Sequence, residues 1–99
     1  MDFLVFWTEK AEEDRERIFE FWNKRNASNI YSRRINELVE KYLKLTKLYP
    51  GVGLATNRLN VRYHLMGRNF KLFYKISGKK IIILRFWDVR QNPKKLTGL

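Results

Sequence analysis

The sequence predicts an α+β fold with the element order β-α-α-β-β-β, in which a helical hairpin packs on one face of a mainly antiparallel sheet. A short run of strand-forming residues opens the chain, and apolar residues then recur every three or four positions up to residue 48. From residue 61 onward the apolar period changes to two, which is typical of strands. We expect residues 1–99 to form a single domain, because this length supports one hydrophobic core.

The first strand and the first helix are predicted from the first quarter of the chain. Phe3 to Trp7 combines aromatic and β-branched residues and therefore predicts a strand. Thr8 is the expected N-cap of the helix, because its hydroxyl can accept from an amide of the first turn. The acidic residues that follow suit the positive end of the helix dipole: Glu9, Glu12, Glu13 and Asp14. We expect this helix to end near Lys24-Arg25-Asn26.

A second helix is predicted from about Ala27-Ser28 to Leu48. Its apolar stripe recurs at helical spacing: Tyr31, Ile35, Leu38, Tyr42 and Leu45. Only a few residues separate it from the first helix, so the two helices should form an αα-hairpin. Pro50-Gly51 is expected to stop the second helix, and Gly51-Val52-Gly53 has neither spacing pattern of a phosphate-binding loop.

Three strands are predicted in the second half of the chain. Residues 61–66 and 70–76 alternate in polarity, and turns at Gly67-Arg68-Asn69 and Ser77-Gly78-Lys79 make consecutive hairpins. Ile81 to Trp87 is apolar at nearly every position, as expected of a central strand. Asn92-Pro93 closes the regular structure.

Charge is distributed very unevenly along this chain. Residues 1–50 hold ten Lys/Arg against nine Asp/Glu, a net charge of +1. Residues 51–99 hold eleven Lys/Arg against the single Asp88, a net charge of +10. Since such a field attracts polyanions, a nucleic acid or an acidic protein is the expected partner.

Alternation assigns the strand residues to two sheet faces. If the helices cover one face, it carries Val61, Tyr63, Leu65, Leu72, Tyr74, Leu84 and Phe86. The open face then carries Arg62, His64, Lys71, Phe73, Lys75, Arg85 and Trp87. Cations between flat rings suit nucleic acid, because the cations meet phosphates and the rings stack on bases. The alternative is a solvated face whose Phe and Trp are covered by a loop or a partner.

Several classes of protein are excluded by composition. The chain has no cysteine, so it has no disulfide and no thiolate ligand or nucleophile, which is consistent with a reducing cytoplasm. His64 is the only histidine and has no Asp/Glu cluster at ligand spacing, so we expect no metal and no cofactor. The apolar start is too short for a signal peptide or a membrane span, and we expect a cytoplasmic protein without a membrane partner.

Four stretches in this order resemble the RelE/ParE family of toxins from type II toxin–antitoxin pairs. Residues 7–14 resemble the strand-to-helix opening, and Tyr49-Pro50-Gly51 followed by Val61-Arg62 resembles the helix end and the next strand. Residues 70–76 resemble the strand with an aromatic–basic–x–x–Tyr pattern, and residues 82–93 resemble the last strand and its Arg-x-x-Pro ending. The resemblance covers essentially the whole chain.

The resemblance implies a RelE/ParE-like fold and a growth-inhibiting toxin that a short acidic antitoxin neutralises. Within the family, ParE-like toxins inhibit DNA gyrase without established catalytic residues, whereas RelE-like toxins cleave mRNA on the ribosome by activating a ribose 2′-OH. No small-molecule substrate is implied. The Arg-x-x-Pro ending is similar to the gyrase-directed branch, as in plasmid stabilization systems.

For a RelE-like enzyme, the resemblance implies that Lys71 and Arg90 stand where the nucleases carry arginines. The nucleases also use a C-terminal Tyr or a His-Tyr pair, which the tail after Arg90 lacks, so the acid–base group would be His64 or Asp88. An ionised Asp88 would repel a scissile phosphate. We therefore favour gyrase inhibition, with a ribosome-dependent mRNA endonuclease and a non-toxic nucleic-acid-binding module as alternatives.

One set of residues is expected to contact the target or nucleic acid in any of these functions. It comprises Arg62, Lys71, Phe73, Lys75, Arg85, Trp87, Arg90, Lys94 and Lys95. The composition also predicts more apolar surface than the chain can cover, which a helix or strand of the antitoxin would bury.

Overall fold

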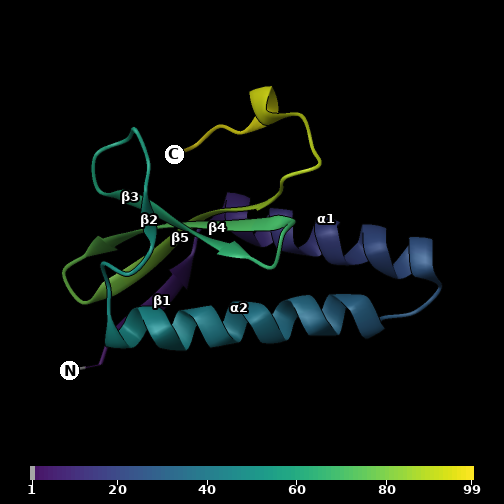
Figure 1. Ribbon diagram of the computed structural model, residues 1–99, viewed down its shortest axis with the longest axis horizontal. Helices are drawn as coiled ribbons and strands as arrows, with labels where there is room; N and C mark the ends of the chain where they lie inside the picture. The colour runs from purple at the N-terminus through teal and green to yellow at the C-terminus, as the bar shows by residue number, and fades with distance from the viewer. Residues whose placement is uncertain (1) are drawn as a thin grey trace.

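The computed structural model describes residues 2–99 and contains a five-stranded sheet with two long helices (Figure 1). Its elements are β1 (Leu4–Trp7), α1 (Glu9–Asn26), α2 (Ile30–Leu48), β2 (Leu54–Ala55), β3 (Val61–Met66), β4 (Phe70–Ser77), β5 (Lys80–Asp88) and a 3₁₀ turn, η1 (Pro93–Lys95). The sheet order is β1-β5-β4-β3-β2, with β1 parallel to β5 and the other neighbours antiparallel. The predicted α+β fold is confirmed, and β2 is a short strand that the sequence did not predict.

Both helices pack on one face of the sheet, which we call the helix-covered face (Figure 1). The core between these layers is formed by Ala11, Ile18, Ile35, Val39, Leu43, Met66, Phe70, Leu72, Tyr74, Ile81, Ile83 and Phe86. In residues 2–99 neither helix is long and apolar enough to cross a membrane.

Thr8 joins β1 to α1 and acts as the predicted N-cap. Its Oγ1 accepts from the backbone N–H of Ala11 at 3.1 Å, and its hydroxyl donates to the carbonyl of Leu84 at 3.1 Å. One side chain therefore starts the helix and fixes it to β5. The second helix begins at Ile30, slightly later than predicted, because Ala27 adopts a left-handed conformation with φ of 49° and ends α1.

Strand β3 has the opposite orientation from the one that alternation predicts. Three residues expected on the helix-covered face lie on the other face: Val61, Tyr63 and Leu65. His64 pairs with Leu72 of β4, and residues that pair across an antiparallel ladder share a face. Since Leu72 lies in the core under the helices, His64 lies there too. The prediction failed because the sheet has an apolar cluster on its second face as well, and Val61 and Tyr63 pack there.

A β-bulge in β5 changes the alternation of that strand. Ile83 and Arg85 pair with consecutive residues of β4, so Leu84 between them has no partner there. As a result Ile83 and Phe86 both lie in the core under the helices, whereas Leu84 lies on the opposite face. The placement of Phe86 is confirmed and that of Leu84 is wrong, because a bulge breaks the period of two.

The C-terminal segment, residues 89–99, returns across the face of the sheet opposite the helices (Figure 1). We call this the tail-covered face. Its apolar cluster consists of Val61, Phe73, Leu84 and Trp87, with Tyr63, Ile82, Leu96 and Leu99 packed against it. Phe73 and Trp87 are each 4% exposed. Of the two interpretations of this face, the one in which its Phe and Trp are covered by another segment is confirmed.

Candidate functional site

The four residues expected to act together in an RNA-cleaving site lie on different sides of the sheet. Lys71 is on the tail-covered face, where its Nζ lies 4.8 Å from the ring centroid of Tyr63. His64 is on the helix-covered face. Asp88 and Arg90 lie at the end of β5, where Arg90 contacts the ring of Phe70 on the helix side. The sheet therefore separates Lys71 from the other three.

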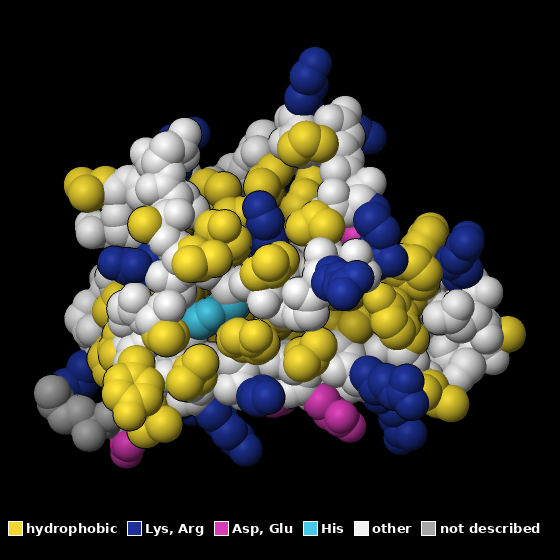
Figure 2. Space-filling model, in the orientation of Figure 1, with side chains coloured by type: hydrophobic (Ala, Val, Ile, Leu, Met, Phe, Trp, Pro, Cys, Tyr) yellow, Lys and Arg dark blue, Asp and Glu magenta, His cyan; other side chains and the backbone are white. Residues whose placement is uncertain are grey.

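His64 is buried between α2 and β4 and is only 5% exposed. Its Nε2 lies 2.6 Å from Thr46 Oγ1, and the hydroxyl of Thr46 donates to the carbonyl of Tyr42 at 2.7 Å. Because that donation uses the hydroxyl proton, Nε2 is the donor to Thr46. Burial lowers the pKa of His64, which favours the neutral imidazole. In Figure 2 only a small part of His64 (cyan) is visible, between hydrophobic side chains.

Arg85 is buried in an ion pair with Asp14 of α1. Its Nε donates to Asp14 Oδ2 at 2.7 Å and its Nη2 to Oδ1 at 2.9 Å, while its Nη1 donates to the carbonyl of Thr97 at 2.6 Å. The bond to Asp14 raises the pKa of Arg85. Asp14 also accepts from the backbone N–H of Phe86 at 3.0 Å. Strand β1 pairs with β5 only as far as Ile83, so this N–H of β5 has no strand partner on that side. Arg85 is therefore structural. It lies on the predicted face with Phe73 and Trp87, but that face is covered and not open.

From the sequence alone, Asp14 was expected only to place negative charge in the first turns of α1. Asp14 is 1% exposed and belongs to the same helical stripe as Ala11 and Ile18, which are also buried. An acidic residue within a buried helical stripe is the signal that could have identified a buried ion pair.

The remaining predicted contact residues differ in their exposure. Arg62 lies on the helix-covered face, opposite to its predicted place, and donates to the carbonyl of Gly53 at 2.8 Å. Phe73 and Trp87 are buried, and Lys71 is half-buried. The exposed ones are Lys75, Arg90, Lys94 and Lys95.

Arg90 is held in one orientation by Asp88. Its Nε donates to Asp88 Oδ1 at 2.8 Å, its Nη2 to Oδ2 at 2.9 Å and its backbone N–H to Oδ1 at 3.0 Å. The guanidinium lies 4.4 Å from the ring centroid of Trp22, whose Nε1 donates a weak bond to Asp88 Oδ2 at 3.4 Å. The hydrogen bond to Asp88 is the main cause that raises the pKa of Arg90, and Tyr31 raises this pKa to a smaller extent. The side chain of Asp88 is 7% exposed and its charge is neutralised by Arg90, whereas the side chain of Arg90 is 42% exposed.

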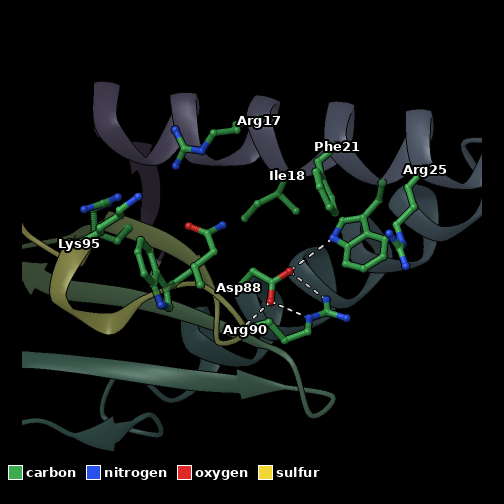
Figure 3. Close-up of a pocket in the computed structure, with 11 residues that line it drawn as sticks. Arg17, Ile18, Phe21, Arg25, Asp88, Arg90 and Lys95 are labelled. Atoms are coloured by element: carbon green, nitrogen blue, oxygen red, sulfur yellow. Dashed lines mark hydrogen bonds and ion pairs between the residues drawn. The ribbon is translucent and has the colours of Figure 1, made fainter.

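Arg90 lines a cavity of about 570 Å³ between α1 and the C-terminal segment (Figure 3). The residues that line it are Arg17, Ile18, Phe21, Trp22, Arg25, Arg85, Trp87, Asp88, Arg90, Gln91 and Lys95. Over residues 2–99 no group of three or more His, Cys, Asp or Glu side chains could hold a metal ion. The cavity can bind an anion through its cations, and apolar groups through its floor.

Solved structures of known toxins share the fold of this chain, among them the following three. The chromosomal ParDE toxin–antitoxin system from P. aeruginosa matches with a TM-score of 0.73 and 22% identity, over 88% of this chain and 96% of that chain. The toxin–antitoxin complex RelBE2 from Mycobacterium tuberculosis matches with a TM-score of 0.63 and 19% identity, over 89% of this chain and 99% of that chain. The YoeB/ParE toxin from Agrobacterium tumefaciens matches with a TM-score of 0.60 and 17% identity, over 89% of this chain and 98% of that chain. No curated protein sequence is significantly similar to the chain.

The sequence itself matches a family model. The matching family is described as the ParE toxin of the type II toxin–antitoxin system parDE, and the match covers residues 5–93, from β1 to the start of η1. The match therefore includes both helices, all of the sheet except Leu4 of β1, and Asp88 with Arg90. The protein belongs to the RelE/ParE family of type II toxins and matches the model of its ParE branch.

Proposed function

We propose that this protein inhibits growth by binding DNA gyrase in the cytoplasm until an acidic antitoxin neutralises it. The observation that carries the proposal is the state of the two expected acid–base groups. His64 is buried and burial lowers its pKa, and the carboxylate of Asp88 is occupied by Arg90. General acid–base catalysis needs such a group within hydrogen-bond reach of the substrate. A surface with exposed cations, on which neither of these two expected acid–base groups is free, suits binding, and the match to the ParE model supports gyrase as the target.

Arg90 is the residue that we expect to contact the target. Asp88 and Trp22 fix its orientation, so little side-chain entropy is lost when a partner binds. Its side chain is still 42% exposed. Ordered and exposed arginines are frequent hot spots of protein interfaces.

Cleavage of mRNA on the ribosome is the second candidate, and one observation favours it. Tyr31 lies close enough to Arg90 to help raise its pKa, and a tyrosine beside an arginine can serve phosphoryl chemistry as an acid. In the sequence, Tyr31 was identified only as part of the apolar stripe predicted for the second helix.

Two reactions with the purified protein separate the candidates. The protein is added to a gyrase supercoiling reaction and, separately, to ribosomes carrying an mRNA. We expect supercoiling to stop and the mRNA to stay intact. Intact supercoiling with codon-dependent cuts that disappear in Tyr31→Phe would establish the enzyme instead. If neither reaction responds and induction does not arrest growth, the toxin proposals are wrong and the non-toxic nucleic-acid-binding module is the remaining alternative.

Arg90→Ala is expected to raise the concentration for half-inhibition of gyrase at least about tenfold. Lys79→Ala is the matched control, because it removes the same charge from an exposed turn far along the strand from Arg90. Circular dichroism establishes that both variants are folded. Equal inhibition by the two variants would remove Arg90 from the target contact.

A further inference from the structure

Strand β1 forms one edge of the sheet, and its outer side carries backbone groups without a strand partner. The backbone N–H groups of Leu4 and Thr8 donate to carbonyls of β5 at 2.9 Å and 3.0 Å. Because backbone groups alternate in direction along a strand, those of Val5 and Trp7 point away from β5. In residues 2–99 no strand lies beyond β1. The outward groups of this edge can therefore pair with an added strand.

The same edge exposes large apolar side chains. Leu4 and Phe6 are 60% and 44% exposed. Phe6 pairs with Ile82, which packs on the tail-covered face, so both exposed side chains lie on that side of the sheet. Strand β1 contains no charged residue and no proline, the residues that usually protect edge strands from pairing. An apolar edge of this kind is suited to contact with another strand.

Helix α1 turns away from this edge of the sheet. The hydroxyl of Thr8 donates to the carbonyl of Leu84, and Asp14 accepts from the backbone N–H of Phe86. Strand β1 pairs with β5 only as far as Ile83, so these contacts lie beyond the end of β1. The helix is therefore fixed to the second half of β5, and it does not occupy the outer side of β1.

Strand β1 is complementary to itself in an antiparallel arrangement. A two-fold axis at Val5 makes the outward backbone groups of the two Val5 residues face each other. Trp7 of each copy then faces Phe3 of the other. The exposed Leu4 of one copy lies directly opposite the exposed Phe6 of the other, and this apolar pair occurs twice. An axis at Phe6 would instead place Phe3 opposite the first turn of α1, so the axis at Val5 gives the longer ladder.

The distribution of charge favours this edge for contact between two copies. Strand β1 is uncharged, and residues 1–50 have a net charge of +1, against +10 for residues 51–99. Two copies that meet at β1 therefore bring together the less basic half of each chain. Salt screens the remaining repulsion between the copies. Their association should strengthen as salt rises, whereas binding of a polyanion weakens.

We propose that two copies of this protein associate through β1 into a two-fold symmetric dimer with one continuous sheet of ten strands. Because an edge of four residues buries less area than a standard interface, the dissociation constant should be on the order of 10–100 μM. Strands β1 and β5 are parallel, so the two β5 strands run in opposite directions. The two copies of Arg90 then lie at opposite ends of the joined sheet, and one dimer can bind two target sites.

Sedimentation equilibrium of the untagged full chain tests the dimer. The protein concentration is varied from about 1 to about 300 μM, which brackets the expected dissociation constant. We expect a monomer at the low end, a dimer at the high end, and stronger association in about 0.5 M than in about 0.05 M NaCl. A monomer over the whole range would overturn the proposal. Association that weakens as salt rises would overturn it as well.

Variants of the edge locate the contact. Val5→Pro removes an outward N–H and leaves the pairing of β1 with β5, because this N–H points away from β5. Leu4→Lys places a charge in the contact. Each variant is expected to weaken dimerisation at least about tenfold.

Leu65→Lys is the matched control for Leu4→Lys, because Leu65 is 43% exposed and lies on β3, on the other side of β5 and β4. It should change the dissociation constant less than about twofold. Circular dichroism establishes that all variants are folded. Equal weakening by Leu4→Lys and Leu65→Lys would place the contact elsewhere and remove β1 from it.

Introduced thiols report the register, because the chain has no cysteine of its own. In a mixture of Leu4→Cys and Phe6→Cys, the two cysteines lie directly opposite each other, with Cα atoms about 4.5 Å apart. In either variant alone the two cysteines are diagonal neighbours, about 7–8 Å apart and out of reach of a disulfide. We expect at least about fivefold more disulfide-linked dimer in the mixture than in either variant alone. Equal yields in all three samples would contradict the proposed register.

A strand from a different protein is the other occupant that this edge could take. A blocked hexapeptide of alternating Val and Glu tests it by calorimetry. We expect no binding stronger than the association of the chain with itself. If the chain stays monomeric while the peptide binds, and Val5→Pro abolishes that binding, the edge takes a different partner and the dimer proposal is wrong.

Discussion

At the scale of single residues, three ionisable side chains carry structural rather than catalytic roles. Asp14, His64 and Arg85 are each at most 5% exposed, and each has its hydrogen-bond partners inside the protein. Burial of such groups is unfavourable unless they are paired or neutral. Their pairing is therefore part of the stability of the fold, and two measurements can establish it.

His64 makes the stability of the protein depend on pH. Burial lowers its pKa in the folded state below the usual value of about 6.5, so the unfolded chain binds the proton more readily. The free energy of unfolding should therefore fall as pH drops from 7.5 to 5.5, and it should fall less in His64→Gln. Urea unfolding at several pH values measures both slopes. Parallel slopes for the two proteins would show that another group is responsible.

Removing Asp14 should destabilise the protein strongly. Asp14→Ala leaves the buried Arg85 without its counter-charge and Phe86 without its acceptor, which costs about 3 kcal/mol. Glu12→Ala is the control, because Glu12 pairs with Arg15 at the surface and such pairs contribute less than about 1 kcal/mol. Urea unfolding at pH 7.5 compares the two. Equal losses would contradict the distinction between the buried and the exposed pair.

At the scale of elements, Tyr74 of β4 fixes the connection between α2 and β2. Its hydroxyl donates to the carbonyl of Pro50 at 2.8 Å and accepts from the backbone N–H of Gly53 at 2.9 Å. Burial raises the pKa of this hydroxyl. Gly53 is buried against the ring, whereas Gly51 has open space around its Cα. Pro50-Gly51 ends α2 as predicted, but the need for a glycine at position 53 comes from β4.

Gly53→Ala should therefore be more harmful than Gly51→Ala. A Cβ at position 53 would lie 2.6 Å from the hydroxyl oxygen of Tyr74, so the loop or the ring must move at a cost of about 1–3 kcal/mol. At position 51 a Cβ meets nothing within 4 Å, and the change should stay within about 0.5 kcal/mol. Thermal unfolding of the two variants checks the difference, and a smaller loss at position 53 would rule out this close contact.

At the scale of the whole molecule, the two sheet faces are covered by different parts of the chain. The helices cover one, and the C-terminal segment covers the other through Leu96 and Leu99. Thr97 ties this segment down by accepting from Arg85 and from Lys10, at 2.6 Å and 2.9 Å. Large apolar side chains stay exposed elsewhere, among them Leu48 and Leu59, as the composition predicts.

Opening the C-terminal segment should expose the tail-covered face. Replacing Leu96 and Leu99 together by Ser removes their contacts with Trp87 and its cluster, which should cost about 2 kcal/mol and shift tryptophan emission to the red. Leu59→Ser is the control, because Leu59 is 90% exposed. Emission spectra and urea unfolding are the measurements. An unchanged spectrum in the double variant would mean that the segment does not cover Trp87 in solution.

Local signals determined much of this protein from the sequence alone. The α+β fold was predicted from the apolar residues at helical spacing in both helices, from the Thr8 cap and from the turn glycines. Each of these signals depends on residues that are close together in the chain. The motifs from β1 to Pro93 predicted the family, and the family model confirms it.

The site depended on contacts that only the tertiary structure supplies. The pairing of β3 with β4 decided which face carries His64, and a bulge decided the face of Leu84. The approach of α1 to β5 buried Arg85 against Asp14, 71 residues away in the chain. Period-two alternation cannot foresee register, bulges or the path of a tail, since these follow from long-range packing. The same packing collected cations from α1, β5 and the C-terminal segment around one cavity.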